Sequence, residues 1–310
     1  MIKYLAHNEI NKRSWDECVK ASVNGRLYAY AWYLDIVCDH WEGLVLDDYR
    51  AVFPLPYRKK FGLNYIYQPV FTQQLGLFSK VPISPQLLED FLNQIPSKYK
   101  YVNLNLNQHN RPKYLKSKPE KRRNIEMDLL DEYGHLKEKY SVNLKRNLKK
   151  AEKSKLTIFE NLKPDAVIQL FKANKGKTLK PFSEDDYVRL IRLVYKAIQQ
   201  GNAEVWGVYT SENNLCAGGI FLQSHKRITF LFSGANDEAK QLAALPYMLD
   251  AFIEAHAGRE LVFDFEGSNN EQLARFYLGF GSKPISYYQI KWIRASFFFK
   301  PVIQAYLLTR

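Results

Sequence analysis

The sequence predicts an α/β protein built from two similar halves, each a mixed, mainly antiparallel sheet flanked by helices. In the first half, short apolar runs at residues 44–46, 51–53 and 65–67 are separated by polar turns, which is typical of an antiparallel meander. The second half shows helical periodicity, then three strand-like runs in succession, a long helix and a final strand. A sequence echo between the halves adds a little weight to a shared plan.

In the first half we also expect helices at residues 11–23, 29–38 and 84–94, and a strand at 101–106. Pro54 and Pro56 follow the second meander strand. Because proline has no N–H to donate to a ladder, they place the end of that strand at a sheet edge.

In the second half, Tyr140, Leu144, Leu148 and Ala151 recur at spacings of four and three, which predicts an amphipathic helix over 141–154. The remaining elements follow from the same patterns. We expect strands at 156–159, 204–209, 215–222, 227–233, 261–266 and 285–292, and helices at 165–174, 184–199, 245–257 and 271–278.

The echo pairs residues 41–51 with residues 206–217. Each stretch starts at a tryptophan (Trp41, Trp206), continues as strand, polar turn and second strand, and reaches an alanine (Ala51, Ala217). Any hairpin has this outline, so the matched Trp and Ala positions add only a little weight to an internal duplication.

Composition excludes several classes of protein. Hydrophobic residues are 46% and charged residues 25%, the balance of a folded globular chain. The N-terminal residues hold no apolar signal segment, and no run approaches the roughly 20 apolar residues that would span a bilayer. Cys18, Cys38 and Cys216 are odd in number and far apart, so they form neither a disulfide framework nor a metal signature. We therefore expect a cytoplasmic protein without a metal site.

The net charge of +13 is concentrated rather than spread. Residues 111–155 hold 15 Lys and Arg against 7 Asp and Glu, a net of +8. Such a stretch favours an anionic partner, whether phosphate, nucleic acid or a lipid headgroup.

Three stretches carry a resemblance to a known family. They are residues 230–236, which lead into the long helix, residues 263–269 with the following Arg275 and Phe280, and the basic residues 145–153. Together with the element order, they resemble the FemAB branch of the GNAT superfamily, whose members carry paired GNAT-like halves and transfer acyl or aminoacyl groups to amines. The resemblance implies an N-terminal GNAT-like half at 1–120, a basic linker at 121–139, and a C-terminal GNAT-like half with the donor site at 140–310.

The resemblance also implies where a donor binds. Ser233 and Gly234 at a splayed strand end would hold the donor carbonyl, and Gln241 and Ala244 near a helix start would lie close to a phosphate. GNAT enzymes that use acyl-CoA carry a glycine-rich loop here, whereas residues 241–246 of this chain hold no glycine. Added Cβ atoms obstruct approach to a pyrophosphate. The loop therefore fits aminoacyl-tRNA, the donor of the Fem-type ligases, better than acyl-CoA; in either case the donor is a substrate and no cofactor is tightly bound.

Two residues are candidates for proton transfer. Asp264 and Glu266 are two apart on an expected strand, and Glu266 at its end would be the general base for an incoming amine. Alternatively, Glu266 caps the turn at Gly267 or pairs with a lysine. Tyr277 lies where GNAT enzymes place a tyrosine that protonates the leaving group, although a packed aromatic residue fits the same position.

Other candidates concern charge and the acceptor. Four basic residues, Lys145, Arg146, Lys149 and Lys150, would form a cradle for phosphates or RNA, or else a solvated helix face. In the first half, Tyr67, Gln73 and Gln74 would contribute to the wall of an acceptor site. By the resemblance, the acceptor is an amine such as a cell-wall precursor.

The C-terminal stretch, from Trp292 through Phe297 to Arg310, mixes aromatic and basic residues. It would either rest on an anionic membrane surface or pack on the core as a closing strand and helix. For the whole chain, the leading hypothesis is direct acyl or aminoacyl transfer to an amine. The alternatives are a non-catalytic binding protein on a degenerate GNAT scaffold and a plain acyl-CoA N-acetyltransferase.

Overall fold

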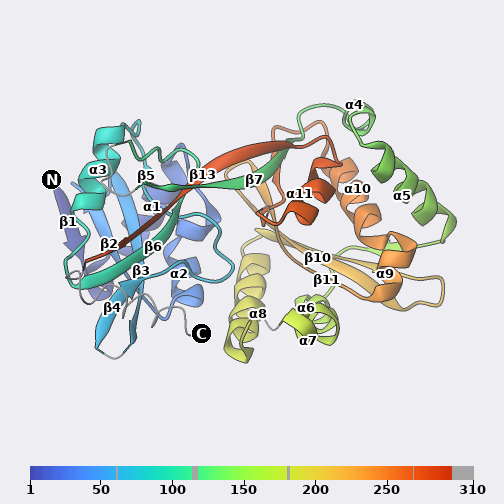
Figure 1. Ribbon diagram of the computed structural model, residues 1–310, viewed down its shortest axis with the longest axis horizontal. Helices are drawn as coiled ribbons and strands as arrows, with labels where there is room; N and C mark the ends of the chain where they lie inside the picture. The colour runs from blue at the N-terminus through green and yellow to red at the C-terminus, as the bar shows by residue number, and fades with distance from the viewer. Residues whose placement is uncertain (61, 114–117, 180–181, 268, 295–310) are drawn as a thin grey trace. The chain divides into compact units, whose positions relative to one another are not determined.

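The structure, a computed structural model, describes residues 1–60, 62–113, 118–179, 182–267 and 269–294 (Figure 1). It divides into two compact units: unit 1 is Met1–Arg122 with the residues from Ser286 onward, and unit 2 is Arg123–Ile285. Each unit has a mixed, mainly antiparallel sheet flanked by helices, so the predicted fold class is confirmed. In the described part of the chain, no helix is long and apolar enough to cross a membrane.

The sheet of unit 1 runs in the order β1-β2-β3-β4-β6-β13, with β5 beside β3. The β4/β6 pair is parallel and the other pairs are antiparallel. Its strands are β1 (Ile2–Leu5), β2 (His40–Leu46), β3 (Ala51–Lys60), β4 (Leu63–Ile66), β5 (Phe78–Ser79), β6 (Tyr99–Leu106) and β13 (Lys283–Ile293). Its helices are α1 (Lys12–Ala21), α2 (Ala31–Val37) and α3 (Pro85–Asn93).

The prolines do not end the middle strand as predicted. β3 continues through Pro54 and Pro56 to Lys60, paired along one side with β2. On its other side, β5 pairs only with Ala51 and Val52, and β4 only from Tyr57 onward. The prolines therefore lie in the gap between these two neighbours, where a missing N–H breaks no ladder.

Unit 2 has the order β8-β9-β10-β11-β12-β7, in which only the β11/β12 pair is parallel. Its strands are β7 (Glu120–Asp128), β8 (Thr157–Phe159), β9 (Ala203–Tyr209), β10 (Leu215–Ser224), β11 (Arg227–Ala235) and β12 (Val262–Asp264). Its helices are α4 (Tyr133–Glu138), α5 (Val142–Lys153), α6 (Pro164–Ala173), α7 (Lys175–Leu179), α8 (Glu184–Gln199), α9 (Asp237–Leu242), α10 (Ala244–His256) and α11 (Glu271–Leu278).

Apart from β5, the strands follow the same plan in each unit. In each, a three-stranded meander (β2-β3-β4 or β9-β10-β11) is followed by a parallel neighbour (β6 or β12) and then by an antiparallel last strand. The tryptophan echo falls on equivalent strands, since Trp41 lies in β2 and Trp206 in β9. The last strands are exchanged along the chain: β7, which closes the first half of the sequence, pairs with β12, whereas β13 from the chain end pairs with β6.

This exchange changes the expected boundaries. Residues 121–139 are not a linker, because they hold most of β7 and all of α4. The segment 140–310 is not one half either, because Tyr288–Ile293 of β13 pair with β6 of unit 1. Residues 121–139 hold five Lys and Arg against five Asp and Glu, so the expected basic character of this segment is wrong as well.

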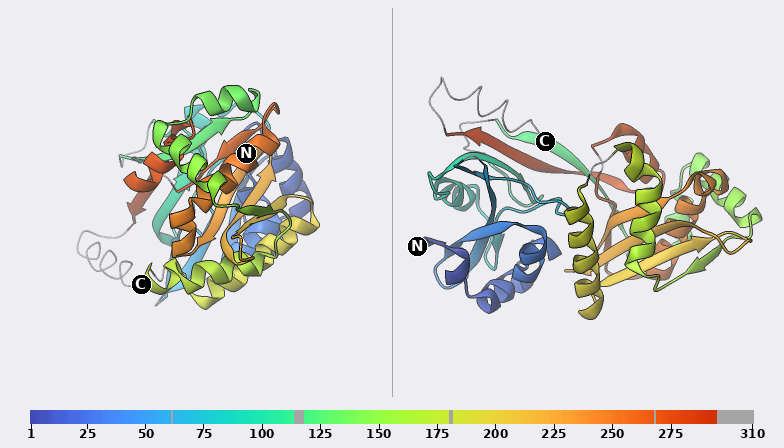
Figure 2. Two further views of the ribbon diagram at one scale, coloured as in Figure 1. Left: turned by 90° about the vertical axis from the view of Figure 1, so that its right-hand side faces the viewer. Right: turned by 90° about the horizontal axis from the view of Figure 1, so that it is seen from below.

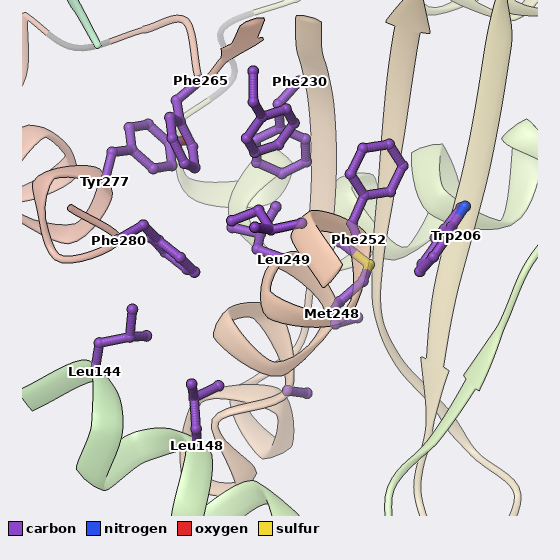
Figure 3. Packing of buried hydrophobic residues seen from close by; sticks show 14 of the residues in the cluster. Leu144, Leu148, Trp206, Phe230, Met248, Leu249, Phe252, Phe265, Tyr277 and Phe280 are labelled. Carbon is purple, nitrogen blue, oxygen red and sulfur yellow. The ribbon is translucent and has the colours of Figure 1, made fainter. Parts of the chain in front are cut away.

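Helices cover both faces of the unit 2 sheet (Figure 2). A Cβ on Gly218 would lie 2.8 Å from Val167 of α6, and a Cβ on the next residue, Gly219, would lie 2.6 Å from Met248 of α10. Because successive strand residues face opposite ways, α6 and α10 lie on opposite faces. The α10 face carries an apolar core, to which α5 contributes Leu144 and Leu148, α11 contributes Tyr277, and Phe280 follows α11 (Figure 3).

Asp16 in α1 gives unit 1 a pH-dependent stability. Its Oδ1 accepts the N–H of Ala31 at 2.7 Å, and burial raises the pKa of its carboxyl group from 3.8 to about 6. Below pH 3.8 the group is protonated in both states. As pH rises through the interval from 3.8 to about 6, the unfolded chain loses its proton first, so this carboxylate progressively destabilises the fold.

We therefore expect Asp16→Asn, whose Oδ1 still accepts the Ala31 N–H, to raise Tm at pH 7 and to leave it unchanged at pH 3.5. Glu17→Gln on the exposed side of the same helix controls for the change in net charge. A gain in Tm that is the same at both pH values would contradict this account of Asp16.

Candidate functional site

The edge of β11 that faces β12 is open over its second half. β12 pairs with β11 only at Arg227, Ile228 and Thr229, and within the described residues no strand continues along that edge beyond Thr229. On the other edge, the register with β10 shifts so that Phe230 and Phe232 have partners while Leu231 has none. Such a bulge redirects backbone groups. The residues from Leu231 to Ala235 therefore offer backbone N–H groups beside a divergence of two parallel strands.

A pocket of about 590 Å³ adjoins the end of this strand. It combines two lysines, three amide side chains and an apolar wall, and none of its lining residues is acidic, a lining that suits an anion attached to an apolar body. The lining residues are Asn147, Lys175, Ala235, Ala239, Lys240, Ala243, Leu245, Pro246, Asn270, Gln272, Leu273 and Phe276.

The first turn of α10 forms one side of the pocket. α9 ends at Ala243, which has a left-handed backbone (φ 55°, ψ 37°), and α10 begins at the next residue. The amides of Ala244 and Leu245 have no acceptor within the helix, and Pro246 has no N–H. The 13-residue helix therefore presents two N–H donors and its positive dipole end toward an anion.

The predicted donor residues have different roles in the structure. Ser233 is partly exposed and lies on the same side of β11 as Ala235, which lines the pocket. Gly234 faces the other way, where a Cβ would lie 2.4 Å from the Val167 carbonyl oxygen of α6, so its lack of a side chain serves helix packing. Gln241 is exposed on α9 outside the lining, and Ala244 is fully buried, so its backbone rather than its side chain is available.

Glu266 lies just beyond the strand expected to contain it. β12 ends at Asp264, and Glu266 (φ 51°) and Gly267 (φ 55°) form a left-handed turn, so the predicted strand alternation does not reach Glu266. Burial, and then the nearby Glu266 carboxylate, raise the pKa of Tyr277. The structure thus brings the two predicted catalytic residues into one neighbourhood.

Tyr277 itself is packed in the core. Its side chain is 6% exposed, and its ring stacks on Phe265 with the centroids 4.8 Å apart (Figure 3). A buried phenol with a raised pKa is a weak proton donor, so the packing role fits this residue better than the predicted acid.

The four basic residues of α5 are exposed, opposite the buried Leu144 and Leu148. Lys145 donates to the Glu138 carbonyl oxygen at 2.9 Å and Arg146 to Asn143 Oδ1 at 2.8 Å. Within the described chain, Lys145, Arg146, Lys149 and Lys150 make no ion pair. Asn147 of the same helix lines the pocket, so this positive helix passes beside it.

The three predicted acceptor residues lie in unit 1 and bond to one another or to unit 1 neighbours. Gln74 is fully buried, donates to Gln73 Oε1 at 2.6 Å and accepts from the Gln108 N–H at 3.0 Å. Tyr67 is 7% exposed, with the Arg58 guanidinium 4.4 Å from its ring centroid. These bonds give Gln74 and Tyr67 a structural role, and the acceptor wall stays a prediction.

Most of the pocket could not be found from the sequence, because Asn147, Lys175 and Phe276 come from three separate helices. The one local signal concerned Asn270, which caps α11 by accepting the N–H groups of Gln272 and Leu273 at 3.0 and 3.1 Å. The sequence suggested Ser268 and Asn269 as caps. Asn269 instead accepts the Arg123 N–H, and Ser268 lies outside the described residues.

The left-handed alanine allows a direct test of this geometry. Left-handed backbone costs a non-glycine residue about 1–2 kcal/mol, whereas glycine in a helix interior costs about 1 kcal/mol. We expect Ala243→Gly to be about 2 kcal/mol more stable in urea denaturation than Ala239→Gly, its buried neighbour inside α9. Equal stability of the two variants would contradict the left-handed cap.

Comparison with known proteins finds a family model that is similar to part of the chain. Residues 138–273 match the family model described as an acetyltransferase (GNAT) domain. Among curated protein sequences, none matches this chain.

Among solved structures, FemX is similar over 98% of this chain and 99% of its own, with a TM-score of 0.66 and 11% identity. L-PGS from Bacillus licheniformis is similar over 96% and 97%, with a TM-score of 0.57 and 11% identity. The C-terminal domain of a putative lysylphosphatidylglycerol synthetase from Agrobacterium fabrum covers 96% and 95%, with a TM-score of 0.57 and 10% identity. The open strand edge, the pocket and the helix start all lie in or beside residues 138–273, the segment that matches the GNAT domain model, and the fold of the chain is similar to that of FemX.

Proposed function

We propose that unit 2 transfers an acyl or aminoacyl group from a phosphate-bearing donor to an amine, by direct attack and without a covalent enzyme intermediate. The observation that carries this proposal is the open edge of β11 next to the first turn of α10, with the pocket between them. The open edge of β11 supplies backbone N–H groups for a carbonyl oxygen, and the first turn of α10 supplies a positive helix end for a phosphate.

In this reaction, the amine nitrogen bonds to the donor carbonyl carbon, and the bond from that carbon to the oxygen or sulfur of the leaving group breaks. Backbone N–H groups around Leu231 and Ser233 stabilise the charge that develops on the carbonyl oxygen. Glu266 takes the proton that the amine loses, and the leaving group gains one as it departs. Most of the acceleration comes from holding donor and acceptor together.

The pocket favours aminoacyl-tRNA as the donor. The α10 start offers only two N–H groups, and the Ala243 side chain lines the pocket where a pyrophosphate would need close backbone approach. The end of an RNA chain carries single phosphates rather than a pyrophosphate. The exposed basic side of α5 lies beside the pocket and would bind phosphates further along the RNA backbone. Acyl-CoA is the alternative donor.

The proposal extends to the acceptor substrate and to the cellular compartment. We expect an amine acceptor, with a cell-wall precursor as the first candidate to test. The three dispersed cysteines are all buried, which favours a reducing cytoplasm as the place of action.

The donor assignment is tested by thermal shift against aminoacyl-tRNA, uncharged tRNA, CoA and acetyl-CoA. A donor at 100 times its Kd should add about 2.7 kcal/mol of apparent stability. We expect aminoacyl-tRNA to give the largest shift and Lys240→Ala to reduce it. Lys226→Ala, at the opposite end of β11, should leave the shift unchanged.

A shift with acetyl-CoA but not with aminoacyl-tRNA would make acyl-CoA the donor. If none of the four ligands shifts Tm, the donor site is refuted. A non-catalytic binding protein is the second candidate, favoured by the buried position of Tyr277; it predicts a shift with tRNA but no transfer to any amine.

A further inference from the structure

At the end of β12, a buried charged network lies beside the turn that carries Glu266. Asp264 and Asn124 are fully buried, Glu126 is 8% exposed, and the Arg227 side chain is 13% exposed. The four residues come from three neighbouring strands, β12, β7 and β11. Buried charges are costly unless they are paired and hydrogen-bonded, so their arrangement calls for a physical account.

The bonds of this network converge on the Asp264 carboxylate. Its Oδ1 accepts from Asn124 Nδ2 at 2.7 Å and its Oδ2 from Arg227 Nη1 at 3.1 Å. Arg227 also holds Glu126, with Nη1 to Oε1 at 2.9 Å and Nη2 to Oε2 at 3.2 Å. Asn124 and Arg227 therefore fix the Asp264 carboxylate from two sides.

The same Oδ1 atom also accepts the backbone N–H of Glu266, at 3.1 Å. This bond spans a turn in which two successive residues, Glu266 and Gly267, have left-handed backbone. For a glutamate that conformation costs about 1–2 kcal/mol, and it persists only where the surroundings determine it. The N–H of Phe265, bonded to the Ile125 carbonyl oxygen at 3.0 Å, fixes the other side of the turn.

We propose that Asp264, anchored by Arg227, is a positioning residue that holds the Glu266 turn in its left-handed form and so sets where the Glu266 carboxylate lies. This inference rests on the proposed function in one respect, the role of Glu266 as base. Its structural part, the hold of Asp264 on the turn, is independent of that role.

Glu126 provides the contrast that separates positioning from general stability. It shares Arg227 with Asp264 and is almost as buried, and its oxygens bond to Arg227 and Asn124, whereas the Glu266 N–H bonds to Asp264. If the network only stabilises the packing of the three strands, removing the Asp264 or the Glu126 carboxylate has the same effect on the turn. If Asp264 positions Glu266, the two removals differ.

The experiment measures exchange of the Glu266 amide hydrogen in the full chain, by NMR of protein labelled with ¹⁵N-glutamate. Loss of a bond to a buried carboxylate should speed this exchange by about 10- to 100-fold in Asp264→Ala. Asp264→Asn has one oxygen where Asp264 has two that accept hydrogen bonds, so its NH2 group must face a donor; it should speed the exchange by about 3- to 10-fold, which keeps the test open if Asp264→Ala fails to fold. Glu126→Gln should lower Tm and leave the Glu266 amide protected.

Turnover adds a second readout. With aminoacyl-tRNA and an amine acceptor, Asp264→Ala should lower kcat by about 10- to 100-fold while the KM for the donor stays the same. Unchanged Glu266 exchange in Asp264→Ala, or equal acceleration in Glu126→Gln, would overturn the positioning role. Full activity of Glu266→Gln would instead overturn the base assignment, and the exchange data would still decide the role of Asp264.

Discussion

Glu266→Gln is expected to lower the rate of acyl transfer by at least about 100-fold while donor binding stays intact, because a general base typically contributes about 10²–10⁴-fold. Glutamine keeps the size and polarity of the side chain but cannot take a proton from the attacking amine. The left-handed turn is a backbone feature held by Asp264, so this substitution leaves the turn in place. The pocket that binds the donor does not include Glu266.

The measurement is single-turnover transfer from radiolabelled aminoacyl-tRNA to an amine, together with the thermal shift given by the donor. Glu260→Gln is a matched control, because Glu260 precedes β12 as Glu266 follows it, and it is exposed in an ion pair with Lys226. A Glu266→Gln protein that transfers at the wild-type rate would remove this residue from the mechanism. A protein that loses donor binding as well would show that Glu266 acts on the pocket rather than on the proton.

Phe252→Ala is expected to destabilise the protein by about 3–5 kcal/mol, the range for deleting a buried phenylalanine side chain. Phe252 is fully buried in α10, and its ring stacks on Phe221 with the centroids 3.7 Å apart. The ring centroid of Trp206 lies 4.9 Å from that of Phe252 (Figure 3), and the centroid of His256 lies 4.2 Å from it. These neighbours come from a helix and two strands and cannot all collapse into the space left behind.

Equilibrium denaturation in urea measures this loss. Val188→Ala provides the control, because Val188 is a branched apolar residue on α8 that is 53% exposed, and its truncation should change stability by less than about 0.5 kcal/mol. Comparable losses in the two variants would mean that the aromatic stack on α10 does not stabilise the fold.

Local patterns in the sequence predicted the helices closely. The stripe of Leu144, Leu148 and Ala151 with a serine before it gave α5, which Ser141 caps by accepting the Leu144 N–H. α8 has the expected bounds, because Ser183 and Asp186 form a capping box at its start. Such signals lie within one turn of the helix they define, so a single sequence contains them.

Pairing between distant strands was not predictable in this way. The expected strand at 261–266 ends at Asp264, whose own carboxylate accepts the Glu266 N–H and is bonded to Arg227 of β11. Residues 121–139 were interpreted as a linker because charged residues obscure the alternating apolar pattern of β7. The partner of β7 is β12, which lies about 140 residues further along the chain. The pocket likewise depends on tertiary packing, since it joins residues from α5, α7, α9, α10 and α11.

The exchange of last strands makes each half of this polypeptide dependent on the other for completion. A fragment cut off before residue 120 leaves β6 without β13, and a fragment that begins after α4 leaves β12 without β7. Each cut would expose a row of unpaired backbone N–H and C=O groups, which promotes aggregation. Because each half of the sequence supplies the last strand of the other unit, neither half can lose its closing strand without leaving an open sheet edge in the other unit.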